Sequence, residues 1–201
     1  HHAQVHPMRK IIWCSILSHG GFVADRDNNI FFHEPCEDVH HYINHLNATN
    51  FFFFKQKTAY EIMNYWDNPP SEDLKLDVVN TYTQQWKQMK KIIVGDVSLT
   101  DDQNDYILWD QLTPDRVNQL LQSLSGDLVI GSNTLAWDLL RLKKITDIQL
   151  ITVPILLGAG QNNFSDAGET PLQLVQHNIF ENGWTYLHYQ VTSKDQVNQN
   201  D

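Results

Sequence analysis

The sequence predicts an α/β fold: a central, mostly parallel sheet with flanking helices and an antiparallel hairpin at its C-terminal end. Short apolar runs rich in β-branched residues alternate with segments whose apolar residues recur every three or four positions. The last two apolar segments, residues 172–180 and 184–191, flank Asn182-Gly183, a dipeptide typical of hairpin turns. The alternation favours parallel strands, and the hairpin adds an antiparallel end.

The first half of the chain predicts three strands and three helices. The apolar run at residues 10–17 is broken by Gly20-Gly21, and residues 25–29 have the composition of a turn. Apolar spacing predicts helices at residues 37–46, 58–66 and 74–89, and strands at residues 10–17, 51–54 and 91–94.

The second half begins with a clear helix start at Thr113-Pro114, which supplies a capping hydroxyl and a proline at the first helical position. Gly126 is the expected C-cap of that helix. We further expect strands at residues 127–131 and 147–157, the second interrupted at Pro154, and a helix at residues 135–142 between them.

Length and composition favour one globular domain over residues 9–191. A chain of 201 residues can bury a large core without disulfides or metal ions. We expect residues 1–8 to be disordered or tag-like and residues 192–201 to form a polar tail.

Charge and cysteine content restrict the partners and the location. A net charge of −10 repels phosphate backbones and anionic headgroups, so nucleic acid and membranes are not expected partners. No apolar run reaches the roughly 20 residues that a membrane helix requires. The start of the chain lacks a signal peptide's apolar region, and only Cys14 and Cys36 are present, which favours reduced thiols and a cytoplasmic location.

A strand that ends in glycine and leads into a helix is the strongest local feature. At residues 128–135, Gly131 follows the apolar run, and small polar residues open the helix. Glycine lets a phosphate approach the backbone, and a helix N-terminus offers unpaired N–H groups. The alternative is a tight turn without a ligand. The glycine-rich segment at residues 156–164 has the same two interpretations, a ligand-binding loop or a surface loop.

Histidines are concentrated around residues 33–45. His41 and His45 are four positions apart and could share a metal ion on one helix face. No metal-binding motif of known spacing frames them, so a solvated, histidine-rich helix is the preferred interpretation and we assign no metal ligands. The cluster consists of His33, Cys36, His40, His41 and His45.

Six motifs follow one another between Arg9 and Val191. The first is a strand at residues 9–12, and the second, Gly21-Phe22-Val23-Ala24-Asp25, is similar to S-x-D-G-x-I-A-D. The third consists of Thr58, Tyr60, Glu61 and residues 63–66, similar to G-R-x-T-Y-E-x-M, and the fourth is the strand at residues 91–94, which a family pattern follows with S-R. The fifth is Val129-Ile130-Gly131-Ser132 with Leu135, similar to V-G-G-x-x-L, and the sixth is residues 153–160 with Phe164, similar to P-V-x-L-G-x-G-x-x-L-F.

In these motifs the chain resembles the dihydrofolate reductase-like family, which includes the C-terminal reductase domain of the bacterial riboflavin-biosynthesis deaminase-reductase. The resemblance implies an NADPH-dependent reductase, commonly a homodimer, that transfers hydride to a small heterocyclic substrate of the pterin or pyrimidine type. It implies nicotinamide contacts at Leu17, Ser18 and Ala24; phosphate contacts at Lys57 and Thr58; pyrophosphate contacts at Gly131, Ser132, Asn133, Thr134 and Leu135; and a substrate pocket at Pro154 and Leu157.

The chain departs from the family pattern at three functional positions. Lys55-Gln56-Lys57 replaces G-R, with one extra residue before Tyr60, and its lysines could still meet phosphate as point charges. Gly20 stands where the family has a loop aspartate, so His19, Asp25 or Asp27 would have to serve as the catalytic group. Gly95-Asp96 replaces the S-R pair, and an acidic side chain repels a 2′-phosphate while accepting from a ribose hydroxyl. NADH is therefore a possible cofactor beside NADPH. A catalytically impaired nucleotide-binding module of the same fold is the alternative function.

Residues 51–62 include a stretch that resembles a technical sequence rather than a protein motif. The run Phe54-Lys55-Gln56-Lys57-Thr58-Ala59-Tyr60-Glu61-Ile62, preceded by more phenylalanines, looks like one reading frame of a common sequencing-library adapter behind a poly-T run. We interpret it as adapter sequence that entered the assembled gene, and we build no mechanism on it.

Overall fold

The computed structural model describes residues 9–27, 29–30, 34–46, 51–95, 106–164 and 167–193, with the side chains of residues 55–60 left out. Ten strands are found in this part of the chain: β1 Ile11–Ser18, β2 Phe22–Ala24, β3 Phe51–Lys55, β4 Lys90–Val94, β5 Tyr106–Trp109, β6 Leu128–Ile130, β7 Asp147–Val153, β8 Gln161–Asn162, β9 Leu172–Ile179 and β10 Thr185–Val191. The helices described are α1 Glu37–Leu46, α2 Gln56–Asp67, α3 Ser71–Leu74, α4 Asp77–Gln88, α5 Pro114–Ser123 and α6 Asn133–Arg141.

Eight strands form one sheet in the order β5-β4-β3-β6-β1-β7-β10-β9, and β2 pairs with β8 separately. The strands from β5 to β7 are parallel to their neighbours, whereas β10 is antiparallel to both β7 and β9. The predicted fold class, with its antiparallel C-terminal hairpin, is confirmed. No helix in the described ranges is long and apolar enough to cross a membrane.

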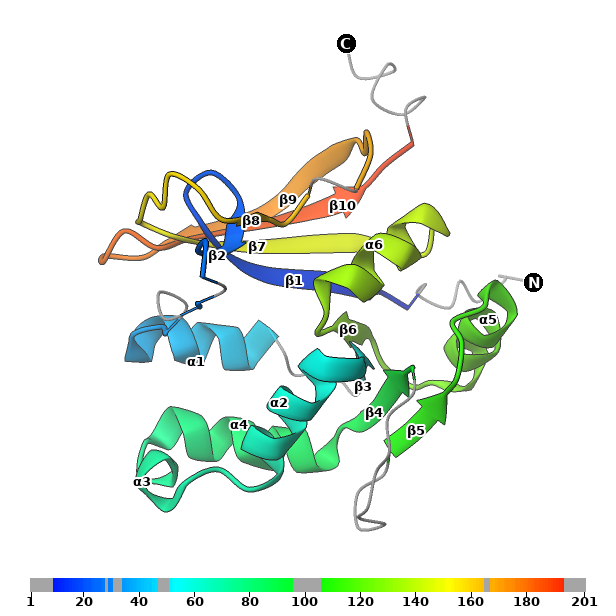
Figure 1. Ribbon diagram of the computed structural model, residues 1–201, viewed down its shortest axis with the longest axis horizontal. Helices are drawn as coiled ribbons and strands as arrows, with labels where there is room; N and C mark the ends of the chain where they lie inside the picture. Colours follow the sequence, from blue (N-terminus) through cyan, green and yellow to red (C-terminus); the bar gives the residue numbers. More distant parts are fainter. Residues whose placement is uncertain are drawn as a thin grey trace, which may run out of the picture.

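The sheet is covered on both faces, and its strands β3 and β6 carry buried apolar side chains toward each face. Phe51 and Phe53 of β3 pack in one cluster with α5 and α6, whereas Phe52 and Phe54 pack in another with α2 and α4. Side chains alternate between the two faces of a strand, so a run of four phenylalanines suits a strand buried on both sides. Figure 1 shows α6 on one side of the sheet, with α1 and α4 on the other.

Helix α5 begins where the sequence predicts it. The Thr113 hydroxyl accepts from the backbone N–H of Arg116 at 3.2 Å, and Pro114 takes the first helical position. The predicted C-cap was wrong. The helix ends earlier, with Leu124 in extended conformation as its C-cap, because the buried Leu124 side chain packs in the core. Gly126 lies beyond the end of the helix.

Two predicted elements are shorter than expected. The helix predicted at residues 74–89 is interrupted between α3 and α4, where Leu74 and Leu76 are exposed and give no burial to hold a continuous helix. The strand predicted at residues 147–157 ends at Val153, because Pro154 has no N–H to donate to a ladder. Helix α6 also starts two residues before its predicted position. The sequence did not predict the short strands β2, β5 and β8.

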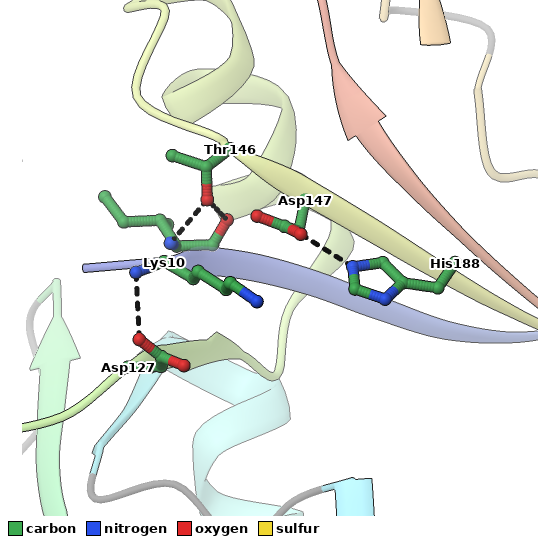
Figure 2. A network of polar contacts seen from close by, with 6 residues as sticks. Lys10, Asp127, Thr146, Asp147 and His188 are labelled. Atoms are coloured by element: carbon green, nitrogen blue, oxygen red, sulfur yellow. Dashed lines mark hydrogen bonds and ion pairs between the residues drawn. The ribbon is translucent and has the colours of Figure 1, made fainter. Parts of the chain in front are cut away.

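Polar contacts hold the amino ends of the central strands together (Figure 2). The backbone N–H of Lys10 donates to Asp127 at 3.0 Å, and the N–H of Ile11 donates to the Thr146 hydroxyl at 2.9 Å. Between β7 and β10, Asp147 and His188 form a buried contact of 2.6 Å. These contacts connect β1, β6, β7 and β10 at the end of the sheet opposite to the predicted phosphate-binding turn.

Candidate cofactor site at the carboxyl ends of the strands

The chain reverses direction across the sheet at β1 and β6, which are adjacent parallel strands. The connection after β1 passes through α1 on one face, and the connection after β6 passes through α6 on the other. In open α/β sheets, ligands bind in the crevice at the carboxyl ends of the strands where such a reversal occurs. The predicted site residues that the structure describes in full lie at this end.

The end of β1 is buried at the carboxyl end of the sheet. Leu17 and Ser18 are buried, with 3% and 1% of their surface exposed. The Ser18 hydroxyl accepts from the N–H of Phe22 at 3.3 Å, and the His19 N–H donates to the carbonyl of Ile155 at 2.9 Å. The loop after β1 is therefore tied to the segment after β7.

Gly131 occupies the turn between β6 and α6, and it is closely surrounded by β3. Its N–H donates to the Phe53 carbonyl at 2.9 Å, and a Cβ built there would lie 3.0 Å from Phe54 Cε1. The next residue, Ser132, is the N-cap of α6. Among the described residues Ser132 makes no side-chain capping bond, although its hydroxyl is 3.1 Å from that of Thr134. The first N–H groups of α6 are thus left for an anion.

Asn133 and Leu135 differ from the role the family resemblance implies, because their side chains point into the protein. The Asn133 amide oxygen accepts from Trp13 Nε1 at 3.1 Å and from the Ser15 hydroxyl at 3.2 Å. Leu135 is fully buried in the core. Their backbone N–H groups remain the groups that could meet a pyrophosphate, and Thr134 is exposed.

The glycine-rich segment after β7 packs against the loop after β1. Gly160 has a φ of +155°, and a Cβ on it would lie 2.2 Å from the Ala24 carbonyl oxygen. Asn163 follows, and its N–H donates to the Gly21 carbonyl at 3.0 Å. Ala24 is 2% exposed, so the predicted nicotinamide-side residue is in contact with this segment. The segment therefore packs beside the loop after β1, and its interpretation as a ligand-binding loop stays a prediction.

Pro154 and Leu157, the predicted substrate pocket, follow β7 directly. Pro154 is exposed and lies 3.5 Å from the position of a Cβ on Gly183. Leu157 is half-buried against the apolar cluster that includes Trp184. Both side chains are apolar and belong to the segment after β7 that is bonded to the end of β1.

The three catalytic candidates have different environments. His19 is exposed, and it lies next to the buried end of β1. Asp25 accepts from the N–H groups of Asp27 at 2.9 Å and Asn29 at 2.8 Å, so one of its oxygens shapes the turn. Asp27 is exposed on that turn.

Three residues predicted to contact the cofactor have side chains outside the described structure. Asp96 lies outside the described residues. Lys57 and Thr58 belong to the first turn of α2, and only their backbone is described.

The histidines of α1 are not gathered around a common point. His41 lies 3.7 Å from Glu37 on the same helix, and burial, followed by the charge of His41, lowers the pKa of His40. Cys36 accepts from the Asn182 amide at 3.0 Å. Over the residues that the structure describes, no three His, Cys, Asp or Glu side chains are grouped to hold a metal ion. His33 lies outside that set.

An open depression of about 1060 Å³ lies at the amino ends of the strands and contains none of the predicted site residues. Its lining mixes Lys10, Arg141 and Lys143 with Asp147 and Glu169. We favour the carboxyl end as the functional site because the strand-to-helix turn, the chain reversal and the glycine-rich segment all meet there.

The sequence prediction missed a set of buried polar residues beneath the turn. Ser15, Asn163 and Trp137 contribute to one hydrogen-bonded chain with Asn133, described further below. Ser15 and Trp137 carry no motif, and Asn163 lies within the glycine-rich segment at residues 156–164 without being singled out, so only the polar character of Ser15 and Asn163 within apolar surroundings could have indicated them.

Solved structures share this architecture, whereas no protein-family model and no curated protein matches the sequence. A protein from Shewanella sp. PV-4 assigned to riboflavin biosynthesis superposes with a TM-score of 0.69 at 14% identity, covering 92% of this chain and 99% of that chain. A pyrimidine reductase-like protein from Corynebacterium diphtheriae gives 0.64 at 13% identity, with 92% and 93% covered.

Acinetobacter baumannii RibD gives a TM-score of 0.67 at 16% identity, and the match covers 92% of this chain but only 58% of RibD. The topology and the order of elements therefore agree with the sequence resemblance. The chain has the dihydrofolate reductase-like fold found in the reductase domain of RibD-type riboflavin-biosynthesis proteins.

Proposed function

We propose that this protein is an NAD(P)H-dependent reductase of a small heterocyclic substrate of the pterin or pyrimidine type. The observation that carries the proposal is the β6–α6 turn at the chain reversal, where Gly131 lies between strand and helix and Ser132 leaves the helix N-terminus without a side-chain cap. The fold shared with a pyrimidine reductase-like protein supports the same reaction class.

The residues at this turn fit a dinucleotide. The N–H groups at the start of α6, together with the helix dipole, would bind the pyrophosphate. When bound, the reduced nicotinamide supplies the hydride. Leu17, Ser18 and Ala24 would form the buried surface beside it and exclude water.

Substrate reduction also needs a proton, and His19 is the favoured donor. Its backbone is fixed by the bond to Ile155, and its side chain is exposed at the end of β1. Asp25 is less suited, because one oxygen accepts from two backbone N–H groups in the turn. Substituting a general acid commonly lowers turnover by about 10²- to 10⁴-fold, so we expect His19→Gln to lower kcat without changing the Kd of the dinucleotide.

Titration with NADPH and with NADH, followed by tryptophan fluorescence, tests the proposal. Trp13 donates to Asn133 and Trp137 donates to the Asn163 carbonyl at 2.7 Å, so both indoles are coupled to the turn. We expect saturable quenching that is lost in Gly131→Asp, which places a negative charge at the turn. Preference for NADH would support an Asp96 contact with the ribose. Quenching by neither dinucleotide would overturn the proposed function.

Turnover separates the reductase from the catalytically impaired module. The module is the second candidate because Gly20 supplies no carboxylate at the position of the family's loop aspartate. Oxidation of the preferred dinucleotide with a panel of pterins and pyrimidines supports the reductase. Binding without oxidation of any panel member supports the module.

We further propose that a second copy of the chain docks along β9. This strand is the last in the sheet, and its sequence, LQLVQHNI, contains no lysine, proline or carboxylate that would block pairing. Leu174 and Ile179 are 47% and 74% exposed on it. A two-fold axis beside β9 would pair identical strands and cover these side chains.

A further inference from the structure

Asn163 is a fully buried polar residue that connects three parts of the candidate site. It lies in the segment after β8 with 0% of its surface exposed. Its side-chain amide donates to the Ser15 hydroxyl of β1 at 3.1 Å, and its carbonyl accepts from Trp137 of α6 at 2.7 Å. Its N–H donates to the Gly21 carbonyl in the loop after β1 at 3.0 Å.

The hydrogen-bonded chain continues from Ser15 to the first residue of α6. The Ser15 hydroxyl accepts from Asn163 and donates to the Asn133 amide oxygen at 3.2 Å. Trp13 donates to that same oxygen at 3.1 Å. Asn163 is thus linked to α6 twice, through Ser15 and Asn133 at the amino end of the helix and through Trp137 one turn further along.

Core stability alone does not explain an asparagine at this position. Its side-chain oxygen is buried and has no hydrogen-bond partner among the described residues. A buried polar atom without a partner is destabilising, and an apolar side chain of similar size would remove that cost. What asparagine provides, and leucine would not, is the amide N–H that reaches Ser15.

We propose that Asn163 is a positioning residue of the cofactor site, which holds the amino end of α6 and the Gly131 turn in their binding geometry through Ser15 and Asn133. The consequence for ligand affinity rests on the proposed function, whereas the link itself is a property of the ligand-free protein. A turn held in place spends a larger fraction of time competent to bind, and the apparent Kd falls in inverse proportion to that fraction.

Hydrogen exchange on the ligand-free protein tests the link. In Asn163→Leu we expect the hydrogen-bonded amides of Gly131 and Ala136 to exchange about tenfold faster than in the wild type, because the Ser15 bond no longer opposes their local opening. We expect Tm to change little, since loss of the unpartnered oxygen offsets loss of the hydrogen bond. Unchanged exchange at these two amides would overturn the proposal.

Asn44 provides a matched control. It is 3% exposed, its amide donates to the Val78 carbonyl at 3.0 Å, and its oxygen also lacks a partner among the described residues. It joins α1 to α4, on the face of the sheet opposite to α6. Asn44→Leu should leave exchange of the Gly131 and Ala136 amides unchanged, and faster exchange there would show a general loosening and contradict the proposal.

Affinity provides the second measurement. We expect Asn163→Leu to raise the Kd of the preferred dinucleotide about tenfold, and to have no further effect in an Asn133→Ala background, since both act through one chain of hydrogen bonds. Additive effects, or an unchanged Kd, would overturn the positioning role. If the wild type binds no dinucleotide, the proposed function fails, and hydrogen exchange still decides the link.

Discussion

Glycine at residue 160 is required by the backbone that faces it. A Cβ there would lie 2.2 Å from the Ala24 carbonyl oxygen, a contact that only a backbone shift relieves. Overpacking of this kind costs about 1–3 kcal/mol, so we expect Gly160→Ala to lower the free energy of unfolding by that amount and to weaken dinucleotide binding. Chemical denaturation and fluorescence titration measure the two effects.

Gly158 is the control for this substitution. It also has a positive φ, +71°, but no heavy atom lies within 4 Å of its Cβ position in the described structure. Gly158→Ala therefore carries only the left-handed backbone strain of about 1 kcal/mol. Equal losses for the two variants would contradict the role of the Ala24 contact.

The two thiols have opposite expected reactivity. Cys14 is partly buried between two apolar clusters, and burial raises the pKa of its thiol to about 12. Because the thiolate is the reactive form, Cys14 should resist alkylation until the pH approaches that value, whereas the exposed Cys36 should be labelled in the native protein. Mass spectrometry should show one label in the native protein and two after unfolding. Native labelling that persists in Cys36→Ser would contradict this.

At the scale of elements, the buried Asp147–His188 pair joins β7 to β10. The two atoms are 2.6 Å apart, and the side chains are 3% and 11% exposed. Removing one member of a buried pair leaves an uncompensated polar group, which costs about 3–5 kcal/mol. We expect His188→Leu to lose stability of this size in chemical denaturation.

The double variant, with Asp147→Leu added to His188→Leu, serves as the control. Replacing both members with apolar side chains should recover much of the lost stability. Dinucleotide affinity should be unchanged in both variants, because the pair lies at the amino end of the sheet (Figure 2). A weakened affinity would mean that the two ends of the sheet are coupled.

For the whole molecule, the two edge strands predict how copies of the chain associate. Leu174 on β9 and Leu108 on β5 are 47% and 48% exposed, and the two strands form the two opposite edges of the sheet. A lysine at the centre of a strand-to-strand interface is buried without a partner, so Leu174→Lys should convert the dimer to a monomer in sedimentation experiments. Leu108→Lys should remain dimeric. A monomeric wild type would contradict the proposed interface.

The sequence by itself determined the fold class, the start of α5, the strand-turn-helix at Gly131 and the C-terminal hairpin. Each depends on neighbours along the chain: a capping hydroxyl at Thr113, a glycine after an apolar run, a turn dipeptide at Asn182. Such signals are local, so periodicity and turn chemistry are sufficient to detect them.

Only the tertiary structure decided which polar residues meet beneath the turn. Ser15 and Asn163 are 148 positions apart in sequence, and their hydrogen bond exists because β8, which Asn163 follows, pairs with β2 in the connection after β1. The break between α3 and α4 was likewise set by exposure, whereas the end of β7 was signalled locally by Pro154. Contacts between distant residues leave no periodic signal in the chain, so the role of Asn163 could be inferred only from the folded molecule.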